Sequence, residues 1–197
     1  MITKHYLSVK KALAMAAMLL SLSTSNAQVS FGSFTMFPNN KLWGSAYKPQ
    51  LAFGKSNDQY LLVLKCTSPT DYASFDRESV MLLRLGNDSL VRLQIISEEA
   101  VVKDYKTSWN SSLKRYDHFY STYTCFIIDD KLVDLIVNNN EVIKKIRVSY
   151  TNGDVQDWDI DAKYQPKLTK GLIRSYEKVE AQDAVRKEKI NDVESGF

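Results

Sequence analysis

The chain has 197 residues, and 26 Lys and Arg residues stand against 23 Asp and Glu residues. The excess lies within the first 27 residues, where Lys4, Lys10 and Lys11 occur without any acid, so the remainder carries a formal charge of 23 − 23 = 0. This balance argues against proteins that bind nucleic acid or an anionic membrane through a basic surface, because both need a cationic excess to neutralise phosphates.

The first 27 residues have the pattern of a secretory signal peptide. After the lysines comes an apolar run from Ala12 to Leu22, and then a short polar stretch that ends at Ala27. Small residues at Ser25 and Ala27 suit signal peptidase, so we predict cleavage after Ala27. The apolar run is shorter than the ~20 residues that cross a bilayer as a helix, which disfavours the alternative of a retained anchor. We therefore expect an exported protein, periplasmic or secreted, with no transmembrane anchor after cleavage.

The rest of the chain predicts a mainly β (α+β) fold, a single antiparallel sheet or sandwich-like domain over 28–165. Strands are expected where residues are densely apolar or alternate between apolar and polar, over 60–66, 80–85, 90–96, 120–128, 143–150 and 155–161. Turns at 86–89 and at Asn152-Gly153 join them into hairpins, the second through a type I′ turn. Residues 28–58 lack periodicity and are expected to form one short strand and then a long loop.

Two helices are predicted as well. Asp129 is placed to cap a short inserted helix from Asp130 to Val137. A second helix occupies 166–197, beginning near Pro166. Its apolar stripe is formed by Leu168, Leu172, Tyr176 and Val179. We expect the first half to pack on the sheet, while the second half projects, frays or meets a second subunit.

The two cysteines after the signal peptide, Cys66 and Cys125, leave two alternatives open. An oxidising compartment permits a disulfide between them. Each also lies in an apolar strand, where cysteine serves as a small hydrophobic residue, so two buried thiols fit equally well.

An acidic run provides a candidate metal site. Asp157, Asp159 and Asp161 alternate with Trp158 and Ile160, so in a strand the three carboxylates share one face. Clustered oxygens suit calcium, yet the run lacks the glycine and the bidentate glutamate of a calcium-binding loop. The alternative is an ordinary solvated face opposite a buried tryptophan.

Aromatic residues supply a second candidate, a ligand-binding platform. Trp43, Tyr105, Trp109 and Tyr116 lie in segments that read as loops and have many polar neighbours. Exposed aromatic rings stack on sugars or contact a peptide, although burial in a core is their more common use. His118 is the one histidine after the signal peptide, and we expect it on the surface.

One stretch resembles uncharacterised exported proteins of Bacteroidota. It comprises Thr124-Cys125-Phe126-Ile127-Ile128, the short helix to Val137, and the strand Glu141-Val142-Ile143-Lys144-Lys145-Ile146-Arg147-Val148. The similarity covers about residues 80–155. It implies a strand–helix–strand unit and an exported protein, and it implies no activity.

Together these patterns favour a non-enzymatic binding or accessory protein of the bacterial envelope whose partner is a protein or a glycan. No catalytic constellation, phosphate-binding loop or cofactor motif is recognisable, so no cofactor is expected. One alternative is a secreted hydrolase acting on glycan or peptide through Asp157 and Asp159. Another is a structural protein that forms a homo-oligomer through its C-terminal helix.

Overall fold

The structure is a computed structural model that describes residues 30–36, 48–56, 58–96 and 101–195. The predicted signal peptide, its cleavage site after Ala27 and the candidate ligand-binding residue Trp43 lie outside these residues.

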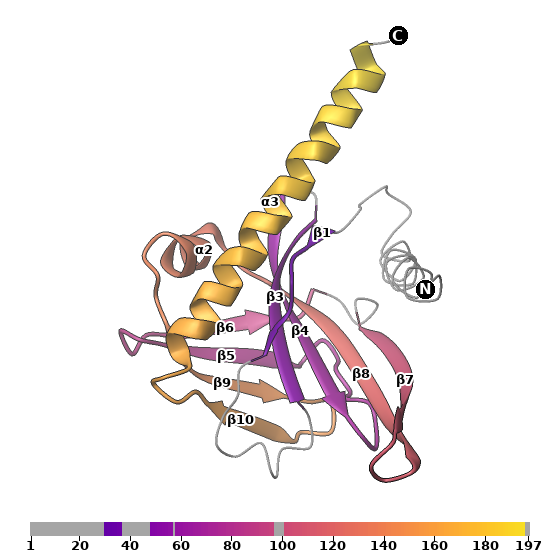
Figure 1. Cartoon of the computed structure of the whole chain (residues 1–197). Helices are drawn as coiled ribbons and strands as arrows, with labels where there is room; N and C mark the ends of the chain where they lie inside the picture. Colours follow the sequence, from indigo (N-terminus) through magenta and orange to yellow (C-terminus); the bar gives the residue numbers. More distant parts are fainter. Residues whose placement is uncertain (1–29, 37–47, 57, 97–100, 196–197) are drawn as a thin grey trace.

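Two antiparallel sheets enclose the main core (Figure 1). The six-stranded sheet has the order β1-β3-β4-β8-β7, with β2 also paired to β3. Its strands are β1 (Ser30–Phe31), β2 (Thr35–Met36), β3 (Lys48–Ser56), β4 (Gln59–Ser68), β7 (Val102–Asn110) and β8 (Arg115–Ile127). The four-stranded sheet has the order β10-β9-β5-β6. Its strands are β5 (Val80–Leu85), β6 (Leu90–Gln94), β9 (Ile143–Ser149) and β10 (Val155–Asp159). The predicted mainly β, sandwich-like fold is therefore confirmed.

Buried and exposed residues alternate along the strands, and the buried ones form the core between the two sheets. In β5, Met81, Leu83 and Leu85 are fully buried, and between them Arg84 is exposed. In β10, Trp158 is fully buried between more exposed neighbours. A bridge between Ile95 and Phe126 links the two sheets at one edge, so the two layers are continuous there.

The prediction for residues 28–58 was wrong in one respect. Residues 48–56 form the nine-residue strand β3, which pairs with β4 along its whole length. A loop was predicted because residues 28–58 lack a strand period and are broken by Pro38, Asn39 and Asn40; within β3 itself, Pro49 and Gly54 are also of types depleted in strands. The pairing with β4 on one side and with β1 and β2 on the other outweighs that local preference.

The helices follow their sequence signals. α2 (Asp130–Val137) begins after Asp129, whose side chain accepts a hydrogen bond from the Leu132 amide at 2.8 Å. α3 (Gln165–Ser195) buries Leu168, Leu172 and Val179 in the main core. Its first half lies across β1, β2 and β3, and its second half projects away from both sheets (Figure 1). No helix in the described part of the chain is both long and apolar enough to cross a bilayer.

The hairpin between β9 and β10 forms as predicted, but through a different turn. A type I′ turn needs positive φ at both central residues. Here Gly153 has a φ of 81°, whereas Asn152 is not among the residues with positive φ. The Gly153 amide donates to the Tyr150 carbonyl and the Tyr150 amide donates to the Asp154 carbonyl, which gives a longer loop closed by the glycine.

Candidate functional site

The β7–β8 hairpin forms a two-stranded ribbon that extends past the core (Figure 1). β8 is mostly exposed from Arg115 to Phe119 and mostly buried from Ser121 to Phe126. Its partner β7 has no fully buried residue. Three of the four predicted ligand-binding aromatics therefore lie on paired strands rather than in loops, and we correct that expectation.

The register of the ribbon brings these aromatics onto one face. Trp109 is directly opposite Tyr116, and Tyr105 is directly opposite Tyr120. Because opposite residues share a face and alternate residues along a strand do too, all four rings lie on the face that continues from the core. Trp109 and Tyr116 contact edge to face at 5.0 Å and are 53% and 60% exposed.

His118 fills the space between these two ring pairs. Its ring stacks on Tyr105 with centroids 5.9 Å apart, and its Nδ1 atom forms a hydrogen bond with the Tyr105 hydroxyl. Tyr105 also contacts Tyr120, which contacts Tyr72 in the loop after β4. We call this set the aromatic face: Tyr72, Tyr105, Trp109, Tyr116, His118 and Tyr120. The alternation Tyr116-x-His118-x-Tyr120 was a sequence signal for it that the loop interpretation missed.

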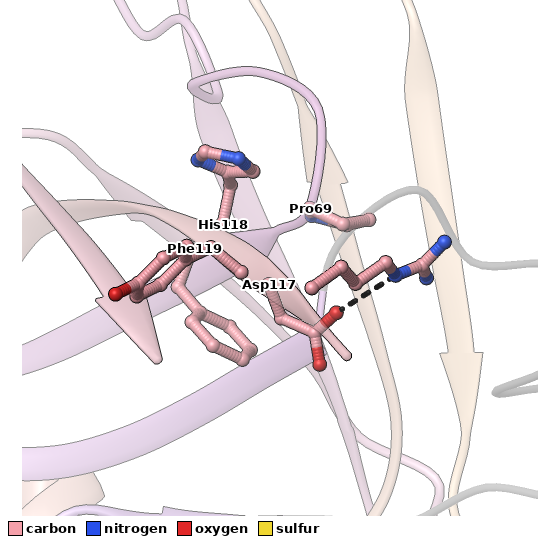
Figure 2. A pocket seen from close by; sticks show the side chains of 6 residues that line it. Pro69, Asp117, His118 and Phe119 are labelled. Atoms are coloured by element: carbon pink, nitrogen blue, oxygen red, sulfur yellow. Dashed lines mark hydrogen bonds and ion pairs between the residues drawn. The ribbon is translucent and has the colours of Figure 1, made fainter. Parts of the chain in front are cut away.

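A shallow hollow with a volume of about 380 Å³ lies along the exposed end of β8 and is bounded by Pro69. In Figure 2, His118 points to one side of the strand while Asp117 and Phe119 point to the other. The Asp117 carboxylate accepts hydrogen bonds from Asn110 at 2.8 Å and from Arg115 at 3.3 Å. These bonds, that from Asn110 foremost, lower the pKa of Asp117. The ribbon thus offers fixed charges on one face and aromatic rings on the other.

The acidic residues of β10 pair with cationic side chains of the neighbouring strand β9. The Asp157 carboxylate accepts two hydrogen bonds from the Arg147 guanidinium, at 2.6 and 2.8 Å. It also forms an ion pair with Lys145 at 2.9 Å. Asp159 pairs with the same lysine at 3.3 Å. The bonds from Arg147, followed by those from Lys145, hold the pKa of Asp157 well below its ordinary value.

This arrangement leaves the predicted calcium site without support. Among the described residues no group of three or more metal-binding side chains comes together, and Asp161 lies beyond the end of β10. The carboxylates of Asp157 and Asp159 serve as the outer face of a strand whose inner face carries Trp158.

The two cysteines are free and buried. Cys66 is opposite Thr122 and Cys125 is opposite Val63, so the thiols occupy opposite faces of the sheet. Cys66 belongs to the main core, whereas Cys125 packs with Leu61 and Val63 in a small second cluster. Burial raises the pKa of both thiols to about 12. Of the two alternatives, the structure has buried thiols and not the disulfide.

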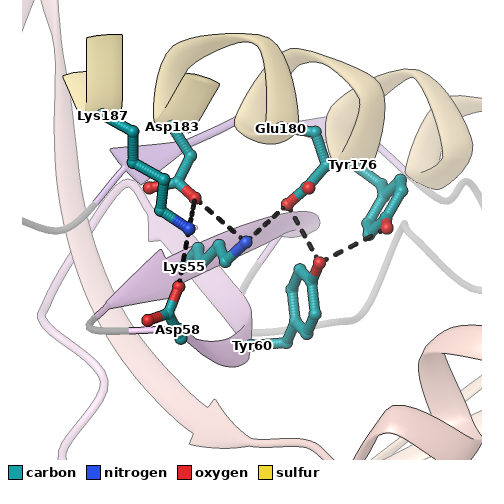
Figure 3. A network of polar contacts seen from close by, with 7 residues as sticks. All are labelled: Lys55, Asp58, Tyr60, Tyr176, Glu180, Asp183 and Lys187. Atoms are coloured by element: carbon teal, nitrogen blue, oxygen red, sulfur yellow. Dashed lines mark hydrogen bonds and ion pairs between the residues drawn. The ribbon is translucent and has the colours of Figure 1, made fainter. Parts of the chain in front are cut away.

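A polar network joins α3 to β3 and β4 (Figure 3). The buried Lys55 ammonium pairs with Glu180 at 2.9 Å and with Asp183 at 3.1 Å. The Tyr60 hydroxyl donates to Glu180 at 2.9 Å. Burial alone would lower the pKa of Lys55, but its hydrogen bonds to the two carboxylates outweigh that effect and raise it. Because every group in Figure 3 has a partner, we assign the network to anchoring the helix.

This network gives a pH-dependent contribution to stability. Burial alone would raise the pKa of Asp183, but hydrogen bonds from Lys55 and Lys187 lower it below 3.8. A carboxylate whose pKa is lower in the folded than in the unfolded protein stabilises the fold at any pH above its unfolded-state pKa. This stabilisation is lost as the pH falls through the folded-state pKa. Below about pH 4 the free energy of unfolding should therefore fall less steeply in Asp183→Asn than in the wild type. Urea unfolding between pH 2 and pH 6 measures this, and equal slopes for the two proteins would contradict it.

Comparisons of the chain with protein-family models, with curated proteins and with solved structures give no match.

Proposed function

We propose that the protein is an exported, non-enzymatic binding protein of the bacterial envelope that holds a partner polypeptide on the aromatic face of its β7–β8 ribbon. The observation that carries this proposal is the alignment of Trp109, Tyr116 and Tyr105 on one exposed face. Solvent-exposed aromatics do not stabilise a core, and aligned rings on a projecting ribbon form a contact surface. Export rests on the signal-peptide pattern of residues 1–27.

The composition of the ribbon favours a polypeptide over a glycan. Trp, Tyr and Arg are the residues that most often dominate the energetics of protein interfaces. On the aromatic face the exposed end of the ribbon holds Trp109 and Tyr116, and its loop adds Leu113, which is 58% exposed. The rings of Trp109 and Tyr116 meet at 63° instead of forming one flat platform on which a sugar could stack.

The two alternative functions have less support. A hydrolase that used Asp157 and Asp159 would need carboxyls facing each other across a substrate. Here both belong to one face of one strand and pair with Lys145. Oligomerisation through α3 could use only its projecting second half, because Leu172 and Val179 are fully buried, and among the residues of α3 whose burial is described that half exposes Val185 as its single large apolar side chain.

The test is the double substitution Trp109→Ala and Tyr116→Ala. We expect it to weaken capture of the partner from envelope extract by at least tenfold, because truncating a central aromatic of an interface typically costs about 2 kcal/mol or more. The matched control is Phe119→Ala, an aromatic on the opposite face of the same ribbon. Quantitative mass spectrometry of the captured proteins compares the three forms.

Each outcome of this test has a defined meaning. Loss of one abundant protein with the double variant, but not with Phe119→Ala, supports the proposal. If no protein depends on the two rings and a glycan array loses signal instead, the ligand is a carbohydrate. If neither signal depends on them, the aromatic face is not the binding site.

A further inference from the structure

We propose that two copies of the chain associate by pairing their β7 strands edge to edge, antiparallel and centred on Tyr105. β7 is the last strand of its sheet, and within the described part of the chain its strand partner is β8 alone (Figure 1). Its outer edge therefore presents backbone N–H and C=O groups that another strand can pair with.

This edge lacks the devices that usually block such pairing. Proteins protect edge strands by making them short, by inserting a bulge or proline, or by covering them. β7 has nine residues, contains neither proline nor glycine, and pairs with β8 in an uninterrupted register. By contrast, the edge strands β6 and β10 of the other sheet have five residues each, and β1 is covered by α3.

Lysines on an edge strand also discourage pairing, and β7 contains two. The Lys103 ammonium lies over the Tyr72 ring, 5.5 Å from its centroid. Lys106 forms an ion pair with Asp104, two residues earlier on the same face of β7, so on that face a second copy meets a pair of opposite charges. Asp104 and Lys106 also limit the register of the second strand, because opposite charges across the two strands attract and like charges repel.

Backbone geometry and charge together select the register. In an antiparallel pair, two directly opposite residues either both point their N–H and C=O groups toward the partner strand or both point them away. In two identical strands these residues alternate, so the two-fold axis must pass between two copies of the same residue. Centring on Lys106 or on Asp104 places two like charges opposite each other, which is destabilising. Centring on Tyr105 places Asp104 of each copy opposite Lys106 of the other.

The resulting dimer extends the binding surface of the proposed function. Opposite residues share a face of the sheet, so the two Tyr105 rings adjoin and both aromatic faces look in the same direction. This association uses the edge of β7, whereas the proposed function uses its face, and each can fail without the other.

Charge reversal tests the register directly. Asp104→Lys sets two cations against each other in a homodimer, and Lys106→Asp sets two anions against each other. We expect each single variant to dimerise at least tenfold more weakly than the wild type. An equimolar mixture of the two variants restores both opposite-charge contacts and should form a heterodimer, which native mass spectrometry identifies by its mass. The variant that carries both substitutions should regain homodimerisation.

Lys103→Asp is the matched control, because this register places Lys103 opposite Thr107 and charge reversal there should change little. Circular dichroism melting of every variant verifies that the fold is retained. A wild-type protein that sediments as a single chain at every concentration overturns the proposal. So does a mixture that forms no heterodimer, or a Lys103→Asp variant that dimerises as weakly as the other two.

Discussion

Replacing Trp158 by alanine is expected to lower the free energy of unfolding by about 3–5 kcal/mol, the range for removing a large aromatic from a core. Trp158 is the largest fully buried side chain in the described part of the chain, and it lies opposite Ile146 of β9. Removal loses its buried apolar surface and leaves a cavity that the two sheets cannot close without moving together. Urea unfolding followed by far-UV circular dichroism measures the loss.

Val155→Ala is the control for that experiment, because Val155 is on the same strand but is 56% exposed. It should change the free energy of unfolding by no more than about 0.5 kcal/mol, as surface substitutions usually do. Equal losses for the two variants would mean that β10 contributes through its strand propensity and not through the buried indole.

Replacing Gly32 by alanine should separate α3 from the first strands and cost about 3 kcal/mol, at the upper end for overpacking. A β-carbon at this position would lie 2.1 Å from the Ser175 Oγ atom and 2.2 Å from the Ser175 carbonyl oxygen. A side chain could rotate away, but the carbonyl belongs to the helix backbone, so the helix itself must shift. That shift breaks the hydrogen bond from the Phe53 amide to Ser175 Oγ, which is 2.9 Å long.

Hydrogen exchange distinguishes this local effect from general unfolding. In Gly32→Ala the amides around Phe53 and Ser175 should exchange faster, while those of β5 and β9 keep the protection of the wild type at low denaturant. The neighbouring Ser33→Ala, at an exposed position, removes only a 3.5 Å hydrogen bond from Lys178 of α3, so it should change exchange in both regions far less than Gly32→Ala does. Uniformly faster exchange in both regions would show that α3 and the four-stranded sheet unfold as one unit.

The elements that could be predicted from sequence are those with local signals. β5 and β6 alternate between buried and exposed residues around a polar turn, and α2 begins at its capping residue Asp129. β3 carries no such signal, because its own residues lack a strand period and its identity depends on pairing with the adjacent β4 and with β1 and β2. β7 was missed for a different reason: it has no fully buried residue, so no hydrophobic period marks it as a strand.

The same distinction applies to the candidate site. Trp109, Tyr105 and Tyr116 could be selected individually as exposed aromatics, but their common face depends on the register between β7 and β8. Likewise Asp157 and Asp159 looked like metal ligands until β9 placed Lys145 and Arg147 beside them. Residue type indicated the chemistry, and strand pairing decided which groups meet.

The docking of α3 on the first strands also determines when folding can finish. Phe53 and Lys55 bind Ser175 and Glu180, partners 122 and 125 residues later in the chain. Contacts at such separation form late, because a long loop must close before they contribute any stability. During synthesis, β3 emerges more than a hundred residues before the helix that covers it. The β-sheets must therefore remain incompletely folded until α3 has been made.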